Sequence, residues 1–228
     1  MRDVALTLLA LGATVGIYRA AAWAQRRLGW TALQPVATTT AVIVAALFAL
    51  SLPTTVYVKR VELLSVLLGP SVVALGAGVE RELPRLRGRA ARVLSAVVAG
   101  AFVGVVSAVG VARLLGASPA IVATLAPKST TTPIAMAIAE RTGGLPPLAA
   151  AIVVLVGVVG AVVGPSLLRV AGVRDPFAWG LALGASSHGV GTARAVEEGE
   201  TQAAASALGL ALTGVVTSLV VPVVLGWL

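Results

Sequence analysis

Residues 145–168 read LPPLAAAIVVLVGVVGAVVGPSLL and contain no Asp, Glu, Lys or Arg. A helix needs about 20 apolar residues to cross the hydrocarbon core of a bilayer, so this run is long enough to span a membrane. Residues 93–112 and 203–228 are also free of these charged residues and meet the same requirement. The sequence therefore predicts an all-α integral membrane protein.

Shorter or less pure apolar runs fill most of the remaining chain, at residues 4–17, 35–52, 61–79, 119–139 and 177–196. Hydrophobic residues make up 58% of the 228 residues and charged residues 11%, whereas soluble domains carry about 25% charged residues. About eight crossings would use the whole chain and leave no soluble catalytic domain. We expect one membrane domain, residues 1–228, with about seven or eight transmembrane helices, in the inner (plasma) membrane as a multi-pass protein.

The positive charge is interpreted as a topology signal. The net charge is +8, and arginines are concentrated in residues 19–30 and 80–92. Cytoplasmic loops are enriched in Lys and Arg, so both segments are expected in the cytoplasm and the N-terminus outside. No nucleic-acid partner is predicted. Residues 22–24, Ala-Trp-Ala, match a signal-peptide cleavage pattern, but Asp3 weakens the basic region before the apolar run. We expect residues 1–29 to be a retained span and basic loop.

Two pairs of similar segments predict an internal repeat. LQPVATTT at 33–40 aligns with LAPKSTTT at 125–132, and LLGPSVV at 67–73 aligns with VVGPSLL at 162–168. Chance similarity is the alternative, because Gly, Pro, Thr and Val are common in this chain. Repeats of three spans, residues 30–116 and 119–198, would have opposite orientations in the membrane, followed by a C-terminal span at 201–228. Inverted repeats with Pro-interrupted helices near the midplane are typical of secondary transporters.

The first polar motif within an apolar run is PKSTTTP, residues 127–133. An uncompensated Lys near a bilayer centre costs about 3 kcal/mol, so Lys128 is expected to face a cavity, a partner or a bound anion. The alternative is that its side chain extends to the membrane interface. Pro127 and Pro133, with Pro35 in the first repeat, are predicted helix breaks. The hydroxyls beside Lys128 complete the candidate substrate site: Ser129, Thr130, Thr131 and Thr132.

The second polar motif is GASSHGVGTAR, residues 184–194, which contains the only His in the chain. Gly184 and Gly191 are predicted helix breaks, although small residues also allow two helices to pack closely. His188 either exchanges a proton or makes a structural hydrogen bond, and Arg194 either binds a carboxylate or caps a helix. The candidate substrate-binding residues here are Ser186, Ser187, His188, Gly189, Thr192 and Arg194. Together the two motifs suit a small carboxylate, and His188 makes proton coupling plausible.

Catalytic chemistry is not predicted. The chain has no Cys, and its one His lacks the Cys, Asp or Glu cluster that a metal site needs. A nucleophile elbow requires Gly two residues before the Ser, but Ala185 stands at that position before Ser187. We therefore predict no enzyme, no catalytic residues, no metal and no cofactor.

Residues 127–135 and 184–197 closely resemble signature segments of the LrgB/CidB family of bacterial membrane proteins. Further similar positions are Gln34, Pro35, Tyr57 and residues 67–70 and 73–75, so the resemblance covers nearly the whole chain. Gln34 stands where the family usually has Asn, and Thr130 where it usually has Val. Residues 76–78 lack the usual proline and aromatic ending. Gln34 is added to the candidate substrate-binding residues.

The resemblance implies two different functions. Bacterial members are described as antiholin-like or holin-like partners of a small LrgA/CidA-type membrane protein, with effects on murein hydrolase activity and lysis. A plastid relative that moves glycolate and glycerate implies transport of small monocarboxylates, including pyruvate. We expect a carrier for a small carboxylate that contacts membrane lipid and forms a homodimer, by analogy with short elevator-like carriers.

Overall fold

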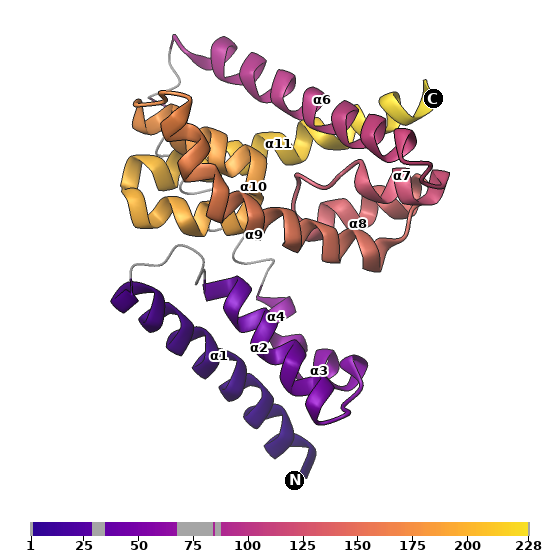
Figure 1. The fold of residues 1–228 in the computed structure, drawn as a ribbon, viewed down its shortest axis with the longest axis vertical. Helices are drawn as coiled ribbons and strands as arrows, with labels where there is room; N and C mark the ends of the chain where they lie inside the picture. The colour runs from indigo at the N-terminus through magenta and orange to yellow at the C-terminus, as the bar shows by residue number, and fades with distance from the viewer. Residues whose placement is uncertain (1, 29–34, 68–83, 85–87, 228) are drawn as a thin grey trace. The chain divides into compact units, whose positions relative to one another are not determined.

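The computed structural model describes residues 2–28, 35–67, 84 and 88–227, and every regular element in these residues is an α-helix. The prediction of an all-α membrane protein is confirmed. The chain divides into two compact units, unit 1 (Met1–Gly76) and unit 2 (Ala77–Leu228). Figure 1 shows unit 1 in indigo and purple and unit 2 in magenta to yellow. The predicted inverted repeat stays a prediction.

The described residues of unit 1 form α1 (Arg2–Leu28), α2 (Pro35–Ala49), α3 (Thr54–Arg60) and α4 (Glu62–Val66). The first apolar run is part of a longer helix than expected, since α1 continues beyond residue 17 and through Arg19. Thr14 Oγ1 and Tyr57 Oη lie 2.8 Å apart and join α1 to α3. Arg60 also pairs with Asp3 at 2.6 Å. Pro35 is the first residue of α2, where a missing N–H is tolerated, so the described part of α2 is not broken there.

Unit 2 contains α6 (Ala90–Leu114), α7 (Pro119–Leu125), α8 (Thr132–Arg141), α9 (Pro146–Val170), α10 (Pro176–Glu198) and α11 (Glu200–Gly226). The three charge-free runs of the sequence form most of α6, α9 and α11. Prolines begin α7, α9 and α10, and the Asp175 carboxylate accepts a hydrogen bond from the Ala178 N–H at 2.7 Å. Proline thus marks the start of all three helices, since its missing N–H costs nothing in the first turn, and α10 has a carboxylate cap in addition.

Four helices of the described residues are long and apolar enough to cross a membrane: α1 from Asp3, α6, α9 and α11. Large apolar side chains such as Leu155 and Leu219 are more than 60% exposed, as expected for surfaces that contact lipid. The core of unit 2 lies instead between helices, where valines of α6 pack with Ala205, Leu208 and Val221 of α11.

Two interruptions divide the helices of unit 2. Residues 126–131 separate α7 from α8; Pro127 lies in this interruption, whereas Pro133 is the second residue of α8. The second interruption is within α10 at His188, whose φ of 43° and ψ of −135° are not helical. It is not at Gly184 or Gly191, which have helical backbone and serve close packing. Both breaks lie in unit 2, and non-helical backbone at membrane depth is tolerated where it is buried in protein or lines a water-filled cavity.

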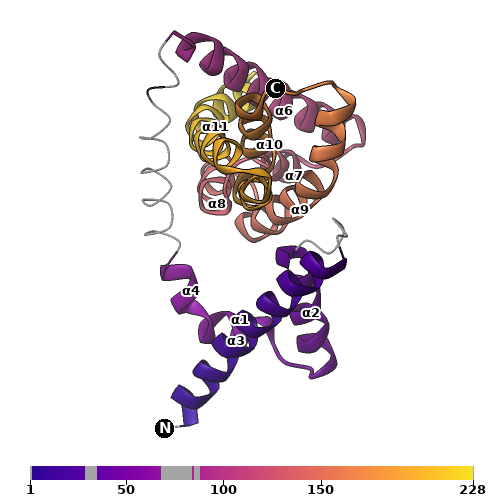
Figure 2. The same cartoon turned by 90° about the vertical axis from the view of Figure 1, so that its left-hand side faces the viewer.

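Glycines let α10 approach both of its neighbours, α9 and α11, and both views place α10 between them (Figures 1 and 2). A Cβ on Gly184 would overlap the Ser206 backbone of α11, and a Cβ on Gly157 of α9 would overlap the His188 ring. Gly199 connects α10 to α11 with φ 145°, a conformation that side chains disfavour. The close contacts at these glycines hold the second polar motif, in α10, between α9 and α11.

Candidate functional site

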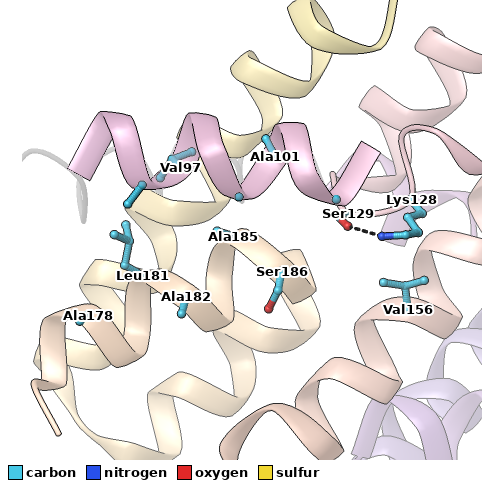
Figure 3. A pocket seen from close by; sticks show the side chains of 13 residues that line it. Val97, Ala101, Lys128, Ser129, Val156, Ala178, Leu181, Ala182, Ala185 and Ser186 are labelled. Carbon is cyan, nitrogen blue, oxygen red and sulfur yellow. Dashed lines mark hydrogen bonds between the residues drawn. The ribbon is translucent and has the colours of Figure 1, made fainter. Parts of the chain in front are cut away.

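A cavity of about 520 Å³ lies between α6, α9, α10 and the interruption at residues 126–131 (Figure 3). Small residues on two facing helices leave this space open: Ala96, Gly100, Ala101 and Gly104 on α6, and Ala178, Ala182 and Ala185 on α10. Lys128, Ser129 and Ser186 are the polar residues of the lining, and Val156 of α9 is beside Lys128 in Figure 3. The cavity is thus mostly apolar, with one cation and two hydroxyls.

Lys128 is half-buried and pairs with no carboxylate in the part of the chain that the structure describes. Its ammonium donates a hydrogen bond to Ser129 Oγ at 3.1 Å, drawn as a dashed line in Figure 3. None of the salt bridges between described residues involves Lys128. An ammonium carries three N–H donors, so two remain for a ligand or water. Of the predicted roles for Lys128, the structure matches a cation that faces a cavity.

The start of α8 adds unpaired N–H donors near Lys128 in the chain. Thr131 precedes α8 without forming a side-chain cap, and no described residue accepts a hydrogen bond from the N–H of Thr132 or Ile134. Helix N-termini carry positive potential and attract anions. The PKSTTTP motif therefore places a cation and a helix N-terminus four residues apart.

The hydroxyls of the second motif are mostly used within the protein. Ser186 is exposed to the cavity, and its Oγ lies 3.1 Å from Ser187 Oγ, which is buried. Thr192 donates a hydrogen bond to the His188 carbonyl oxygen at 3.0 Å and lies 3.0 Å from Ser206 Oγ of α11. Gly189 is exposed and does not line the cavity. Of this group, only Ser186 is placed to meet a ligand in the cavity.

His188 is buried outside the cavity. Its Nε2 lies 2.7 Å from the Val153 carbonyl oxygen of α9, so Nε2 carries the proton and donates it. The ring fits against Gly157, which has no side chain to displace it. The structure thus shows the structural hydrogen bond that was one of the two predicted roles.

Arg194 is not in the cavity either. Its guanidinium pairs with Glu197 at 3.1 Å and with Glu198 at 2.5 Å, both in the last turns of α10. This arrangement matches the alternative that Arg194 stabilises the helix end. Thr130 is buried and does not line the cavity, Thr131 and Thr132 are half-buried without lining it, and Gln34 lies outside the described residues.

Sequence reasoning missed the apolar part of the lining. Gly100 and Gly104 were visible as a small-residue face of one helix, but such faces also serve helix packing and dimerisation. Ala178, Ala182 and Ala185 repeat at intervals of four and three residues, which is the spacing of one helix face. Two facing helices with small residues could have indicated an open space beside Lys128.

Comparisons with known proteins agree with the resemblance read from the motifs. The model of the LrgB-like family matches residues 14–227. The uncharacterized protein YxaC of Bacillus subtilis is 32% identical over all of this chain and 99% of its own length. The protein named antiholin-like protein LrgB of Bacillus mycoides is 32% identical over 71% of this chain and 70% of its own.

An uncharacterized protein of Haemophilus influenzae is 37% identical over 69% of this chain and 68% of its own. No solved structure matches the chain. These comparisons indicate a membrane protein and no catalytic family. With the family model covering nearly the whole sequence, the chain belongs to the LrgB-like family.

Proposed function

We propose that this protein is a carrier for small organic anions such as glycolate, glycerate or pyruvate. The observation that supports the proposal most is the Lys128 ammonium at the wall of a cavity of about 520 Å³, where no carboxylate of the described residues pairs with it. A cation in an apolar cavity within a membrane protein is costly unless an anion or water compensates it. A small carboxylate supplies the compensating negative charge, and its oxygens accept hydrogen bonds from the two remaining N–H groups of the ammonium.

The lining suits a short acid with a small polar tail. The carboxylate would pair with Lys128, and the hydroxyls of Ser129 and Ser186 would contact a hydroxyl or carbonyl group of the same molecule. Charge-assisted hydrogen bonds are about twice as strong as neutral ones, so Lys128 would dominate affinity. The alanines and glycines of α6 and α10 leave room for the ligand and its water.

Uptake into proteoliposomes tests the proposal. Liposomes that contain the purified full chain are expected to accumulate radiolabelled glycolate or pyruvate with saturable kinetics, and unlabelled short acids are expected to compete. Uptake equal to that of empty liposomes across a panel of two- to four-carbon acids would rule out the carrier.

A second candidate function is regulation of murein hydrolase activity and lysis, because relatives with 32% identity are named antiholin-like protein LrgB. In that case the chain would act by assembly with a small LrgA/CidA-type membrane partner. Two results would favour it over the carrier: leakage of markers according to size, and a lysis phenotype that persists when Lys128 is replaced. A carrier predicts neither result. We further propose that the chain is a multi-pass protein of the inner membrane and forms a homodimer.

A role of His188 in proton coupling is a separate question, and His188→Gln tests it. The Gln amide retains an N–H donor for the Val153 carbonyl oxygen but does not titrate. Because Nε2 of His188 already donates to that oxygen at 2.7 Å, we expect uptake by His188→Gln to stay within about threefold of wild type, with the same pH profile. Loss of the pH dependence in this variant, with folding intact, would instead assign the coupled proton to His188.

A further inference from the structure

The C-terminal part of α1 carries a cluster of arginines that the proposed anion cavity does not use. Six residues of this helix line an open space of about 670 Å³, and together they are called the arginine patch: Tyr18, Arg19, Ala22, Trp23, Arg26 and Arg27. All three arginines and both aromatic residues of the patch are exposed. The patch therefore combines three accessible cations with two aromatic rings.

The patch lies on the side of α1 opposite its buried residues. Ala21 and Gln25 are only 6% and 9% exposed and mark the packed side of the helix. At 3.6 residues per turn, residues 19, 23 and 26 point to the opposite side. Trp23 is accordingly 60% exposed. The arginines are thus presented on a helix face that is open to a ligand.

No carboxylate of unit 1 compensates the charge of the patch. Residues 1–76 contain two acidic residues, Asp3 and Glu62. Asp3 is in the first turn of α1 and pairs with Arg60, and Glu62 follows Arg60 by two residues, so both acids lie toward the N-terminal end of α1. At 1.5 Å per residue, Arg26 is about 35 Å from Asp3 along the helix. The positive charge of the patch is therefore unbalanced within unit 1.

Two contacts orient the guanidinium groups without using their terminal N–H groups. The guanidinium carbon of Arg27 lies over the Trp23 ring, 5.4 Å from the ring centroid. Arg26 Nε donates a hydrogen bond to the Ala22 carbonyl oxygen at 3.2 Å. The terminal N–H groups of both side chains stay available, and their planar geometry matches the oxygens of a phosphate.

The length of the apolar part of α1 places the patch at the membrane surface. A span needs about 20 residues, and residues 4–23 contain one charged residue, Arg19. With Asp3 at one interface, Trp23 lies at the other, where Trp and Tyr are enriched in membrane proteins. The other two arginines are then one turn further, at the level of the lipid phosphates. The long side chain of Arg19 can extend to the same level.

We propose that the arginine patch binds the phosphate of an anionic phospholipid such as phosphatidylglycerol, with the acyl chains along the apolar part of α1. Charge-assisted hydrogen bonds from guanidinium to phosphate supply the affinity, and Trp23 holds Arg27 in position. Basic clusters beside a membrane span on the cytoplasmic side suit anionic headgroups, and this segment is expected on that side. Lipid binding goes beyond the proposed anion transport and does not depend on it.

The test measures equilibrium binding of radiolabelled phosphatidylglycerol to the delipidated full chain in a non-ionic detergent. We expect saturable binding that weakens as the salt concentration rises, because the patch is exposed and salt screens its charge. Phosphatidylcholine with the same acyl chains is expected to bind about tenfold more weakly or worse, since its headgroup has no net charge. Inorganic phosphate at equal ionic strength is expected to displace little of the lipid.

The double variant Arg26→Gln with Arg27→Gln is expected to weaken phosphatidylglycerol binding by about 30-fold, since each arginine near an anionic headgroup contributes about fivefold. Trp23→Leu keeps every arginine but removes the ring beneath Arg27, and a loss of about threefold is expected.

The matched control is the double variant Arg89→Gln with Arg92→Gln. Both arginines are exposed at the start of α6, and their segment is also expected in the cytoplasm, so the same charge is removed elsewhere. We expect lipid binding by this control to stay within about twofold of wild type, because screened charges outside the patch act weakly. Circular dichroism checks that each variant is folded.

Four results would overturn the proposal. Equal losses in the two double variants would show a general effect of net charge, and equal binding of the two phospholipids would assign the affinity to the acyl chains. Displacement of the lipid by inorganic phosphate would assign the patch to a soluble anion. Absence of saturable binding would mean that another part of the chain or a second copy supplies the compensating charge. None of these results bears on anion uptake, which is measured separately.

Discussion

Lys128→Gln is expected to lower anion uptake (kcat/KM) by about 30- to 150-fold, the largest functional effect of any single substitution in the chain. The ammonium is the charge at the cavity wall, and a hydrogen bond to a charged group contributes about 2–3 kcal/mol. Glutamine keeps most of the length of the side chain and a donor but loses the charge. The measurement is the initial rate of labelled glycolate or pyruvate uptake into proteoliposomes over a range of concentrations.

The sequence supplies a matched control, because Lys59 is the only other lysine. Lys59 is exposed at the end of α3 in unit 1, so Lys59→Gln removes the same charge without touching the cavity. We expect uptake by Lys59→Gln to stay within about twofold of wild type. Lys128→Arg should retain more uptake than Lys128→Gln, since the charge remains. Equal rates for Lys128→Gln and wild type would show that the ammonium does not bind the transported anion.

Gly184→Ala is expected to cause the largest loss of stability. The added Cβ would overlap the carbonyl of Ser206, and a helix backbone cannot yield as the end of a flexible side chain can. Forcing extra atoms into a packed interface costs about 1–3 kcal/mol, and more where two helices must separate. We expect a clearly lower Tm in detergent, measured by circular dichroism, and reduced yield of folded protein.

Gly189→Ala is the control for this substitution. Gly189 is in the same helix, is exposed, and has no atom within 4 Å of an added Cβ. Since Ala is the better helix former by about 1 kcal/mol, Gly189→Ala should leave the Tm unchanged or raise it slightly. A Tm for Gly184→Ala as high as that of Gly189→Ala would contradict the close approach of α10 and α11.

The helices were largely predictable because their signals are local. Charge-free runs of sufficient length became α6, α9 and α11, and prolines marked several helix starts. The glycines of residues 184–191 indicated an unwound or closely packed stretch, but they did not give the exact position of the break, which occurs at His188 and not at a glycine. Gly184 and Gly191 serve close packing instead. A Cβ on Gly184 would overlap α11 and a Cβ on Gly191 would overlap Leu183, and these neighbours are known only from the folded structure.

The candidate site could be predicted only in part, because only some of its signals are local in the sequence. Lys128 was recognisable from the sequence because a charge within an apolar run is rare and needs a physical explanation. His188 and Arg194 met the same criterion, but both have partners inside the protein. The partner of His188 is a tertiary contact, the Val153 carbonyl in α9, whereas the partners of Arg194 are local, the carboxylates three and four residues on in α10. The open space beside Lys128 depends on alanines and glycines from two helices, which carry no chemical signal of their own.

The most direct test of the anion site is an experimental structure of the full chain determined in the presence of glycolate. We expect density for the acid in the cavity between α6, α9 and α10, with a carboxylate oxygen within hydrogen-bond distance of Lys128 Nζ and Ser186 nearby. Glycolate bound elsewhere, or a cavity filled by lipid with Lys128 turned out of it, would contradict an anion site at Lys128.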